Sequence, residues 1–182
     1  MRPKELNYFE QLETTLEAQL SKVIRDFQNL TEQQLTQTPA GGGWSISECF
    51  QHLNTYGDYY LPLLLEATVG AEGQTSGPKH RPSRLGSYLV KMIDPDRSSK
   101  KMKALKRHLP DPLLPPHLVL ATHLEQQENL LGMLRKLDNM DTRKRTIPTT
   151  LSGLLKLNAL DVARFLVVHN ERHIGQAERV GA

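Results

Sequence analysis

Apolar residues recur at steps of three and four along four long stretches of the chain. This spacing places them on one face of an α-helix, so each stretch predicts an amphipathic helix. The helices are expected over residues 3–29, 45–69, 116–137 and 158–180. Pro3 suits the opening turn of the first helix. Its apolar stripe consists of Leu6, Phe9, Leu12, Leu16, Leu20, Val23 and Phe27.

Polar residues mark where the second and fourth helices begin. Ser45 and Glu48 have the spacing of a capping box, in which the hydroxyl accepts from a first-turn amide and the carboxylate accepts from the cap amide. Asn158 is a favoured N-cap for the last helix, and Asp161 follows it by three residues. Both signals support the helix boundaries that the apolar spacing predicts.

The segments between these helices differ in length and regularity. Residues 31–40 predict a connector with at most one short helical turn, and three glycines at 41–43 interrupt the chain. Residues 70–116 are rich in glycine and proline, and two short helices fit within them, over 84–93 and 97–109. A connection this long is typical of a functional segment. Residues 138–157 form a second linker, and no segment alternates long enough to predict a strand.

Four long amphipathic helices with unequal connectors predict an all-α protein with the architecture of a four-helix bundle. The two long connectors allow crossovers, so a simple up-down-up-down order is not required. The whole chain, residues 1–182, has the length of one domain with a full core.

Composition limits the possible locations and partners of the protein. No apolar run has the length of a membrane span, and the N-terminus shows no apolar signal-peptide region, so no membrane association is expected. One cysteine, Cys49, excludes an intramolecular disulfide and favours a cytoplasmic location. The net charge of +3 comes largely from basic groups at 100–107 and 143–145. Neither group contains an aromatic residue, so no nucleic-acid partner is expected, and solvated surface is favoured over the rim of an anion site.

Three histidines are the strongest candidates for chemistry. His169 and His173 are four residues apart on the last helix, so their imidazoles point the same way. They belong to a stripe that begins with Val162 and ends with Val180, and this face should therefore be directed inward. His52 on the second helix could complete a three-nitrogen metal site with open positions. Histidines that are hydrogen-bonded within the core remain the alternative.

Several neighbours of these histidines are candidates for shaping the site. Tyr56 follows His52 by one turn and could line a pocket, or it could be a core or interface tyrosine. Glu48 precedes His52 by one turn and could orient it or act as a base, although its capping role is favoured. Gln176 could hydrogen-bond a ligand or water. Cys49 is expected to be a small buried residue, because no local charge marks it as a nucleophile.

The remaining histidines give no such pattern. His80 and His108 lie in the irregular region and are expected at the surface, as is His117 at the start of the third helix. His123 is next to the apolar stripe of that helix and is expected at the boundary of the core. None of them has a partner at metal-ligand spacing.

The motifs and their order resemble the DinB-like superfamily, also called DinB/YfiT-like, of metal-binding four-helix bundles. The resemblance rests on the run from Trp44 to Glu48 leading to His52, and on His169, His173 and Gln176 near the C-terminus. It covers nearly the whole chain. It implies a divalent metal held by His52, His169 and His173, and a homodimer, which is common among relatives.

The family also suggests reactions. Characterised relatives include S-transferases and a maleylpyruvate isomerase that use low-molecular-weight thiols. A related domain supplies the iron ligands of sulfoxide synthases, but those enzymes carry a second large domain for which 182 residues leave no room. The resemblance therefore favours a metal-dependent enzyme with a small-molecule substrate, either a thiol S-transferase or a hydrolase. A metal-binding or stress-related module without catalysis is the alternative.

The identity of the bound metal is expected to depend on which ions are available to the protein. Imidazole sites accept zinc, nickel, copper and iron, so zinc or nickel is the first expectation and iron the next. Any pocket should open beside the three histidines, with part of the segment 70–116 as its roof, because long connectors beside an open metal position carry substrate selectivity.

Overall fold

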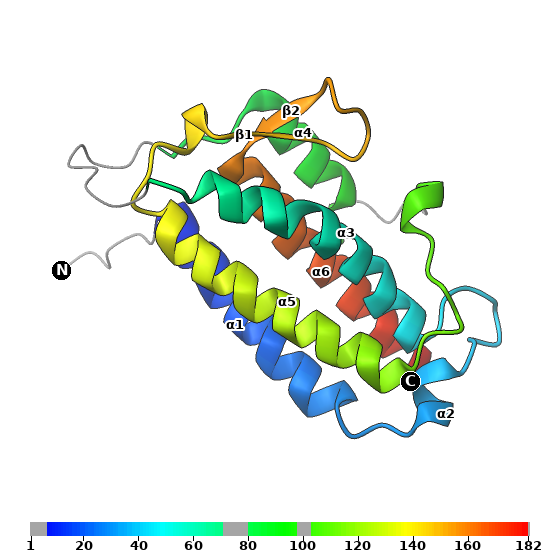
Figure 1. The fold of residues 1–182 in the computed structure, drawn as a ribbon. Coiled ribbons are helices and arrows are strands. Elements are labelled where there is room, and N and C mark those ends of the chain that lie inside the picture. The colour runs from blue at the N-terminus through cyan, green and yellow to red at the C-terminus, as the bar shows by residue number, and fades with distance from the viewer. Residues whose placement is uncertain (1–6, 71–79, 98–102, 182) are drawn as a thin grey trace.

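The computed structural model describes residues 7–70, 80–97 and 103–181. Four long helices form the body of the protein: α1 (Tyr8–Phe27), α3 (Ile46–Ala67), α5 (Pro116–Leu137) and α6 (Ala159–Gly181). They correspond to the four helices that the apolar spacing predicts, and they pack side by side as a bundle (Figure 1). The prediction of a four-helix bundle is confirmed.

The order of the helices around the bundle is not the order along the chain. Helix α3 packs against α5 and α6, and α1 packs against the same two helices, so α1 and α3 lie on opposite corners. Figure 1 shows α3 and α5 running in the same direction, with α6 antiparallel to both. The segment between α3 and α5 must therefore return along the bundle, which is the crossover that its length allows.

The apolar core consists of two clusters, one at each end of the bundle. The first includes Tyr56 of α3 and Val167 of α6, and the second includes Leu53 of α3 and Ile174 of α6. The boundary between the two clusters therefore lies between Leu53 and Tyr56 on α3 and between Val167 and Ile174 on α6. Polar side chains placed at this boundary are buried without interrupting either cluster.

The helix ends follow the capping signals in the sequence. Ser45 Oγ accepts from the Glu48 amide at 3.2 Å, and Glu48 Oε2 accepts from the Ser45 amide at 2.8 Å, which confirms the capping box. Asn158 Oδ1 accepts from the Asp161 amide at 2.8 Å, as expected of an N-cap. Helix α1 begins at Tyr8 because the Asn7 side chain caps it, so the expected start at residue 3 is wrong. Pro3 itself lies outside the described residues.

The connectors hold shorter elements. Helix α2 (Glu32–Thr36) is the expected short turn, and α4 (Arg84–Ile93) has the predicted bounds. The helix predicted over 97–109 is wrong where the structure describes it, since only the 3-10 turn η1 (Lys106–His108) forms there. Residues 98–102 of that prediction lie outside the described residues.

A small hairpin occupies the second linker, where no strand was expected. After the 3-10 turn η2 (Thr142–Lys144), β1 (Thr146–Pro148) pairs antiparallel with β2 (Lys156–Asn158), with Ile147 opposite Leu157. Three-residue strands are too short for alternation to be recognised in a sequence. Ile147 and Leu157 are buried in the first core cluster, so the hairpin extends the core.

Helix α4 is docked on the start of α6 through a buried carboxylate. Asp161 is fully buried, and its Oδ2 accepts from the amide of Ser83, the N-cap residue of α4, at 2.9 Å. Gly86 lies directly against this carboxyl group, and a methyl group there would come closer than 3.0 Å to Asp161. The absence of a side chain at Gly86 is what lets α4 approach α6.

Three of the four remaining histidines are more buried than expected. His108 is 2% exposed and His123 is 1% exposed, so the predictions of surface and boundary positions are wrong. The His80 side chain packs edge-on against Phe9, with ring centroids 4.7 Å apart, and bonds the backbone oxygen of Asp138 at 2.9 Å. His117 is exposed, as expected.

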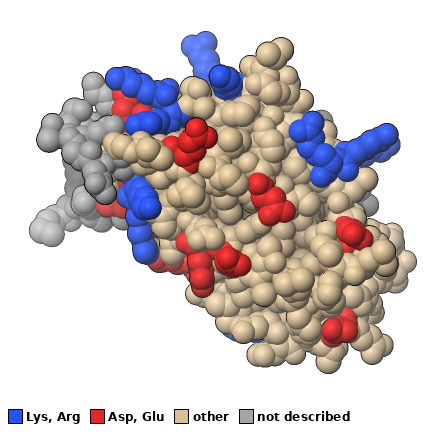
Figure 2. All heavy atoms as spheres, viewed as in Figure 1, with Lys and Arg blue, Asp and Glu red and all other residues tan. Residues whose placement is uncertain are grey.

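The charged residues are dispersed on the face shown in Figure 2. Lys and Arg side chains lie in separate groups near its margin, with Asp and Glu between them, and no continuous basic surface covers this face. Among the described residues, no helix is both long enough and apolar enough to cross a membrane.

Candidate metal centre

The antiparallel packing of α3 and α6 brings the three candidate histidines together. His52 lies in the first half of α3, whereas His169 and His173 lie at the middle of α6 and just beyond it, so the opposite directions of the helices place them at one level. This level is the boundary between the two apolar clusters. All three side chains are buried, with exposed fractions of 3%, 5% and 7%.

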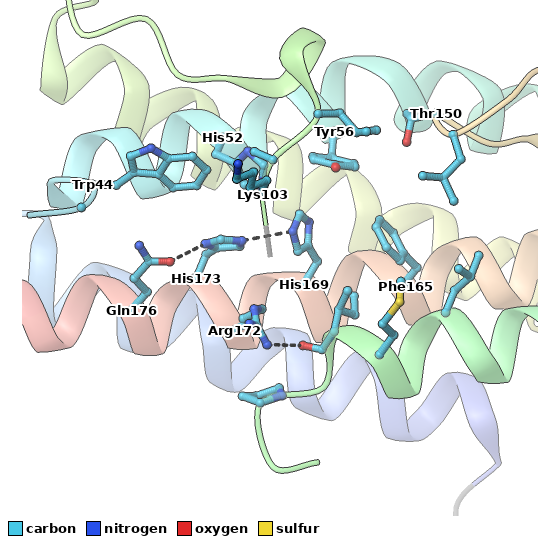
Figure 3. A pocket seen from close by; sticks show the side chains of 18 of the residues that line it. Trp44, His52, Tyr56, Lys103, Thr150, Phe165, His169, Arg172, His173 and Gln176 are labelled. Carbon is cyan, nitrogen blue, oxygen red and sulfur yellow. Dashed lines mark hydrogen bonds between the residues drawn. The ribbon is translucent and has the colours of Figure 1, made fainter. Parts of the chain in front are cut away.

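The imidazole nitrogens converge on one point. One nitrogen from each ring lies within 4.8 Å of the nitrogens of the other two. His169 Nε2 and His173 Nε2 are 3.1 Å apart, and Figure 3 shows the two rings facing each other, with His52 opposite. The expectation that the three residues cluster is confirmed.

Hydrogen bonds on the outer side fix two of the rings. His52 Nδ1 donates to the backbone oxygen of His108 at 2.6 Å, and His173 Nδ1 donates to Gln176 Oε1 at 3.0 Å. Each bond puts the proton on Nδ1 and leaves the Nε2 lone pair directed at the centre. His169 Nδ1 is buried and has no hydrogen-bond partner among the described residues.

Burial keeps all three imidazoles neutral. It is the largest cause that lowers the pKa of His52, opposed by the bond to the His108 backbone, and it lowers the pKa of His169 well below its ordinary value. Burial, with the neighbouring His52, lowers the pKa of His173 to about 3. A cation that binds here would not have to displace protons from the Nε2 atoms of His52 and His173 at neutral pH.

The donor set and its spacing fit a divalent cation. Three imidazole nitrogens suit zinc, nickel, copper or iron. Two nitrogens at ~2.1 Å from one tetrahedral ion are ~3.4 Å apart, close to the 3.1 Å between His169 Nε2 and His173 Nε2. Without a cation, those two lone-pair positions face each other and only one of them can carry a proton. The residues could therefore hold a metal with further positions open.

Aromatic rings enclose the centre on two sides. Trp44 packs on His52 with ring centroids 4.6 Å apart, and Tyr56 packs edge-on against His169 at 4.6 Å. His108 stacks on the other side of Tyr56 at 3.8 Å, and its Nδ1 lies 2.9 Å from Thr55 Oγ1. The histidine rings are thereby held between rigid neighbours rather than left free to rotate.

A cavity of about 770 Å³ opens beside the three histidines. Helix α6 forms one wall, and residues of α4 and residues 103–105 also line the cavity. These last two elements belong to the connector between α3 and α5, so the expectation that part of this connector roofs the pocket is confirmed. Trp44 closes one end, and Thr149 to Leu151 of the hairpin loop line the other.

The other candidate residues have mixed outcomes. Tyr56 and Gln176 line the cavity, and Gln176 orients His173 directly. Glu48 does not line the cavity, because its carboxylate caps α3, and the His108 backbone orients His52 in its place. Cys49 is fully buried, and burial with the nearby Glu48 raises its pKa to about 12, which makes it an inert thiol at neutral pH.

The residue that sequence reasoning missed is His108. Its backbone oxygen fixes His52, and its ring supports Tyr56. No periodicity surrounds it, and 56 residues separate it from His52. The one feature of the sequence that pointed to His108 was its place in the long connector at 70–116, which is typical of a functional segment.

Comparisons with known proteins identify a similar fold and a family. No curated protein matches the chain in sequence. The fold is similar to that of YfiT from Bacillus subtilis, with a TM-score of 0.58 and 16% identity, over 99% of this chain and 90% of that one. YfiT is described as a probable metal-dependent hydrolase with an unusual four-helix bundle topology. At this identity the likeness concerns the fold alone.

The sequence itself identifies the family. The sequence model of the DinB superfamily matches residues 15–177, a span that includes α3, α5, most of α1 and α6, and all three clustered histidines. The match covers far more than half of the chain. The chain therefore belongs to the DinB superfamily.

Proposed function

We propose that this protein is a metal-dependent enzyme that acts on a small molecule at His52, His169 and His173. The observation that carries the proposal is the convergence of three neutral imidazoles at the side of a cavity. A structural metal site is closed by four protein ligands, whereas three ligands beside a cavity leave a position for a substrate. We expect zinc or nickel, and after them iron, because imidazole suits each of these ions.

The reaction that we favour is the transfer of a low-molecular-weight thiol to an electrophilic carbon. A divalent cation in such a site acidifies a coordinated thiol or water, so that a nucleophile exists at neutral pH. The described residues that line the cavity include no Asp or Glu. A hydrolase of the kind that uses a carboxylate base to deprotonate water lacks that base here, whereas thiol transfer does not require one.

Hydrolysis is the second candidate, and the likeness to YfiT favours it. Tyr56 lines the cavity in contact with the ring of His169, and burial raises its pKa to about 12. At neutral pH the Tyr56 hydroxyl can donate a hydrogen bond to a substrate oxygen, but it cannot serve as a base. Its place against His169 suits a donor that orients a substrate in either reaction.

One purified sample distinguishes these reactions. Protein prepared without a nickel column should contain about one divalent ion per chain by plasma mass spectrometry, and His173→Ala should contain none. Zinc-loaded protein is then offered monochlorobimane with glutathione, bacillithiol or mycothiol analogues, and separately p-nitrophenyl acetate without a thiol. Thiol conjugation that His173→Ala lacks supports transfer, and ester cleavage that it lacks supports hydrolysis.

The remaining outcomes are equally informative. Cobalt-substituted protein should develop an intense near-ultraviolet charge-transfer band when the correct thiol binds through sulfur. An unchanged cobalt spectrum with every thiol would contradict the transfer reaction. Metal binding without either activity would leave a non-catalytic metal-binding module. The homodimer that we expect from the family resemblance is tested by light scattering on the same sample.

A further inference from the structure

The cavity is long, and its walls change character from one end to the other. On α6 the lining residues include Phe165 and Arg179, with His169 and His173 between them. Fourteen residues of helix span about 21 Å, so a bound molecule can contact the histidines with its middle and both ends of the cavity with its termini. Figure 3 shows Phe165 on one side of the histidines and Gln176 and Trp44 on the other.

The end beyond Phe165 is mainly apolar, although Thr149 and Thr150 of the hairpin loop also line it. Leu89 and Met92 of α4 and Leu157 of β2 line this end, and all three belong to the first core cluster or pack against it. Tyr60 also lines this end, but its hydroxyl is bonded to the Thr150 amide at 3.0 Å. An apolar group placed here would exchange water for carbon contacts, which is favourable in proportion to the area buried.

The part of the cavity at the level of the histidines and beyond them, away from Phe165, is cationic. Lys103, Arg172 and Arg179 line it, and no described lining residue is acidic. Lys103 and Arg179 make no ion pair with any described residue. Elsewhere cations are commonly neutralised, as where Arg135 bonds Glu13 at 3.1 Å and Glu17 at 3.2 Å. Two unpaired cations at one cavity therefore mark a place where a ligand can supply the negative charge.

Arg172 fixes the geometry of this cationic wall. Its Nη1 donates to the backbone oxygen of Ile93 at 3.3 Å, which ties the end of α4 to α6 (Figure 3). Arg172 directly precedes His173 in the chain, and this bond holds its guanidinium in the wall of the cavity. Lys103 extends toward the histidines from the opposite side in the same view.

From this arrangement we propose that the substrate is an amphipathic anion, with a carboxylate, sulfonate or phosphate held near Lys103 and Arg179 and an apolar group held near Phe165. The proposal rests on the proposed function, since it places the reacting atoms of the substrate between these groups, beside the three histidines. A cationic molecule of the same shape is disfavoured, because it would meet the like charges of Lys103 and Arg179.

The charge preference can be measured without turnover. Octanoate, octanamide and octylamine share one apolar chain and differ in charge, and calorimetry gives their affinities for protein from which metal has been removed by chelation. Octanoate should bind at least tenfold more tightly than octanamide, and octylamine should not bind. Added salt should weaken octanoate binding, because Lys103 and Arg179 are exposed and their charges are screened.

Matched variants assign the effect to the cavity. The double substitution Lys103→Gln with Arg179→Gln should reduce the preference for octanoate over octanamide at least tenfold. The control double substitution Lys136→Gln with Lys144→Gln removes the same net charge from exposed positions that do not line the cavity, and it should leave the preference unchanged. An equal loss in both double variants would show only an effect of net charge and would overturn the proposal.

The failure of this proposal can be told apart from a failure of the metal site. Zinc binding to the wild-type protein is measured in the same instrument without any anion. If zinc binds but octanoate and octanamide bind equally, or neither binds, the substrate class is wrong while the metal site stands. If zinc does not bind but octanoate is still preferred through Lys103 and Arg179, the metal site is wrong and the anion preference is retained.

Discussion

Adding one methyl group at Gly86 should destabilise the protein, although alanine is the better helix former. Gly86 lies inside α4, where alanine in place of glycine would otherwise contribute about 1 kcal/mol of stability. The added carbon would come closer than 3.0 Å to the carboxyl group of Asp161. That carboxyl group is fully buried and bonded to the Ser83 amide, so it cannot move aside without losing its partner.

The net effect follows from these opposing contributions. Forcing an extra carbon into a packed site costs about 1–3 kcal/mol, and weakening a hydrogen bond to a buried carboxylate costs about 1–3 kcal/mol more. After the gain of about 1 kcal/mol in helix propensity, Gly86→Ala should lower the free energy of unfolding by about 1–5 kcal/mol. Because α4 forms part of the cavity wall but carries none of the three histidines, zinc affinity should change much less than stability.

The matched control is Gly132→Ala in α5, where an added methyl group would meet nothing within 4 Å. This substitution should raise the free energy of unfolding by about 1 kcal/mol. Urea denaturation followed by circular dichroism measures both variants under one set of conditions. If Gly86→Ala were as stabilising as Gly132→Ala, the docking of α4 on α6 through Asp161 would be refuted.

Three further predictions concern the histidines. His173→Ala should retain the helical circular dichroism of the wild type but bind no zinc, because the core is large enough to fold without metal; loss of both signals would make the site structural. His108→Ala should weaken zinc binding about 10–100-fold by calorimetry, because its ring no longer holds the backbone oxygen that orients His52; unchanged affinity would remove that role. Burial lowers the pKa of His123 from 6.5 to about 3, so between these values the unfolded chain binds one more proton and stability rises with pH by about 1.4 kcal/mol per pH unit for this group. His123→Leu should reduce the pH slope of the unfolding free energy by that amount, whereas exposed His117→Leu should not.

The parts of the fold that the sequence predicts are those determined by local spacing. The four long helices follow from apolar steps, and the caps at Ser45 and Asn158 follow from side chains that satisfy amides within three residues. The i,i+4 pair of His169 and His173 is likewise set by one helix. His52 could be named as a candidate third ligand, and the family resemblance supported it, but its contact with the pair depends on how α3 and α6 pack.

The parts that were missed depend on contacts between segments far apart in the chain. His108 is buried because its backbone meets His52 and its ring meets Tyr56, and neither contact has a local signal. The hairpin of β1 and β2 forms because Ile147 and Leu157 complete the first core cluster. Each strand has only three residues, which are too few to show the alternation of a strand in the sequence. Cations at the cavity were foreseen only as a basic group around Lys103, since Arg172 and Arg179 could be placed there only by the packing of α6.

X-ray absorption at the zinc edge tests the central claim most directly. The claim is that His52, His169 and His173 hold a divalent ion through their Nε2 atoms and leave a position open to the cavity. Zinc-loaded protein should show three imidazole nitrogens at about 2.0–2.1 Å, with the remaining ligand a light atom that is replaced by sulfur at about 2.3 Å when a thiol substrate binds. Coordination by oxygen alone, or a sulfur ligand in the absence of added thiol, would contradict the account.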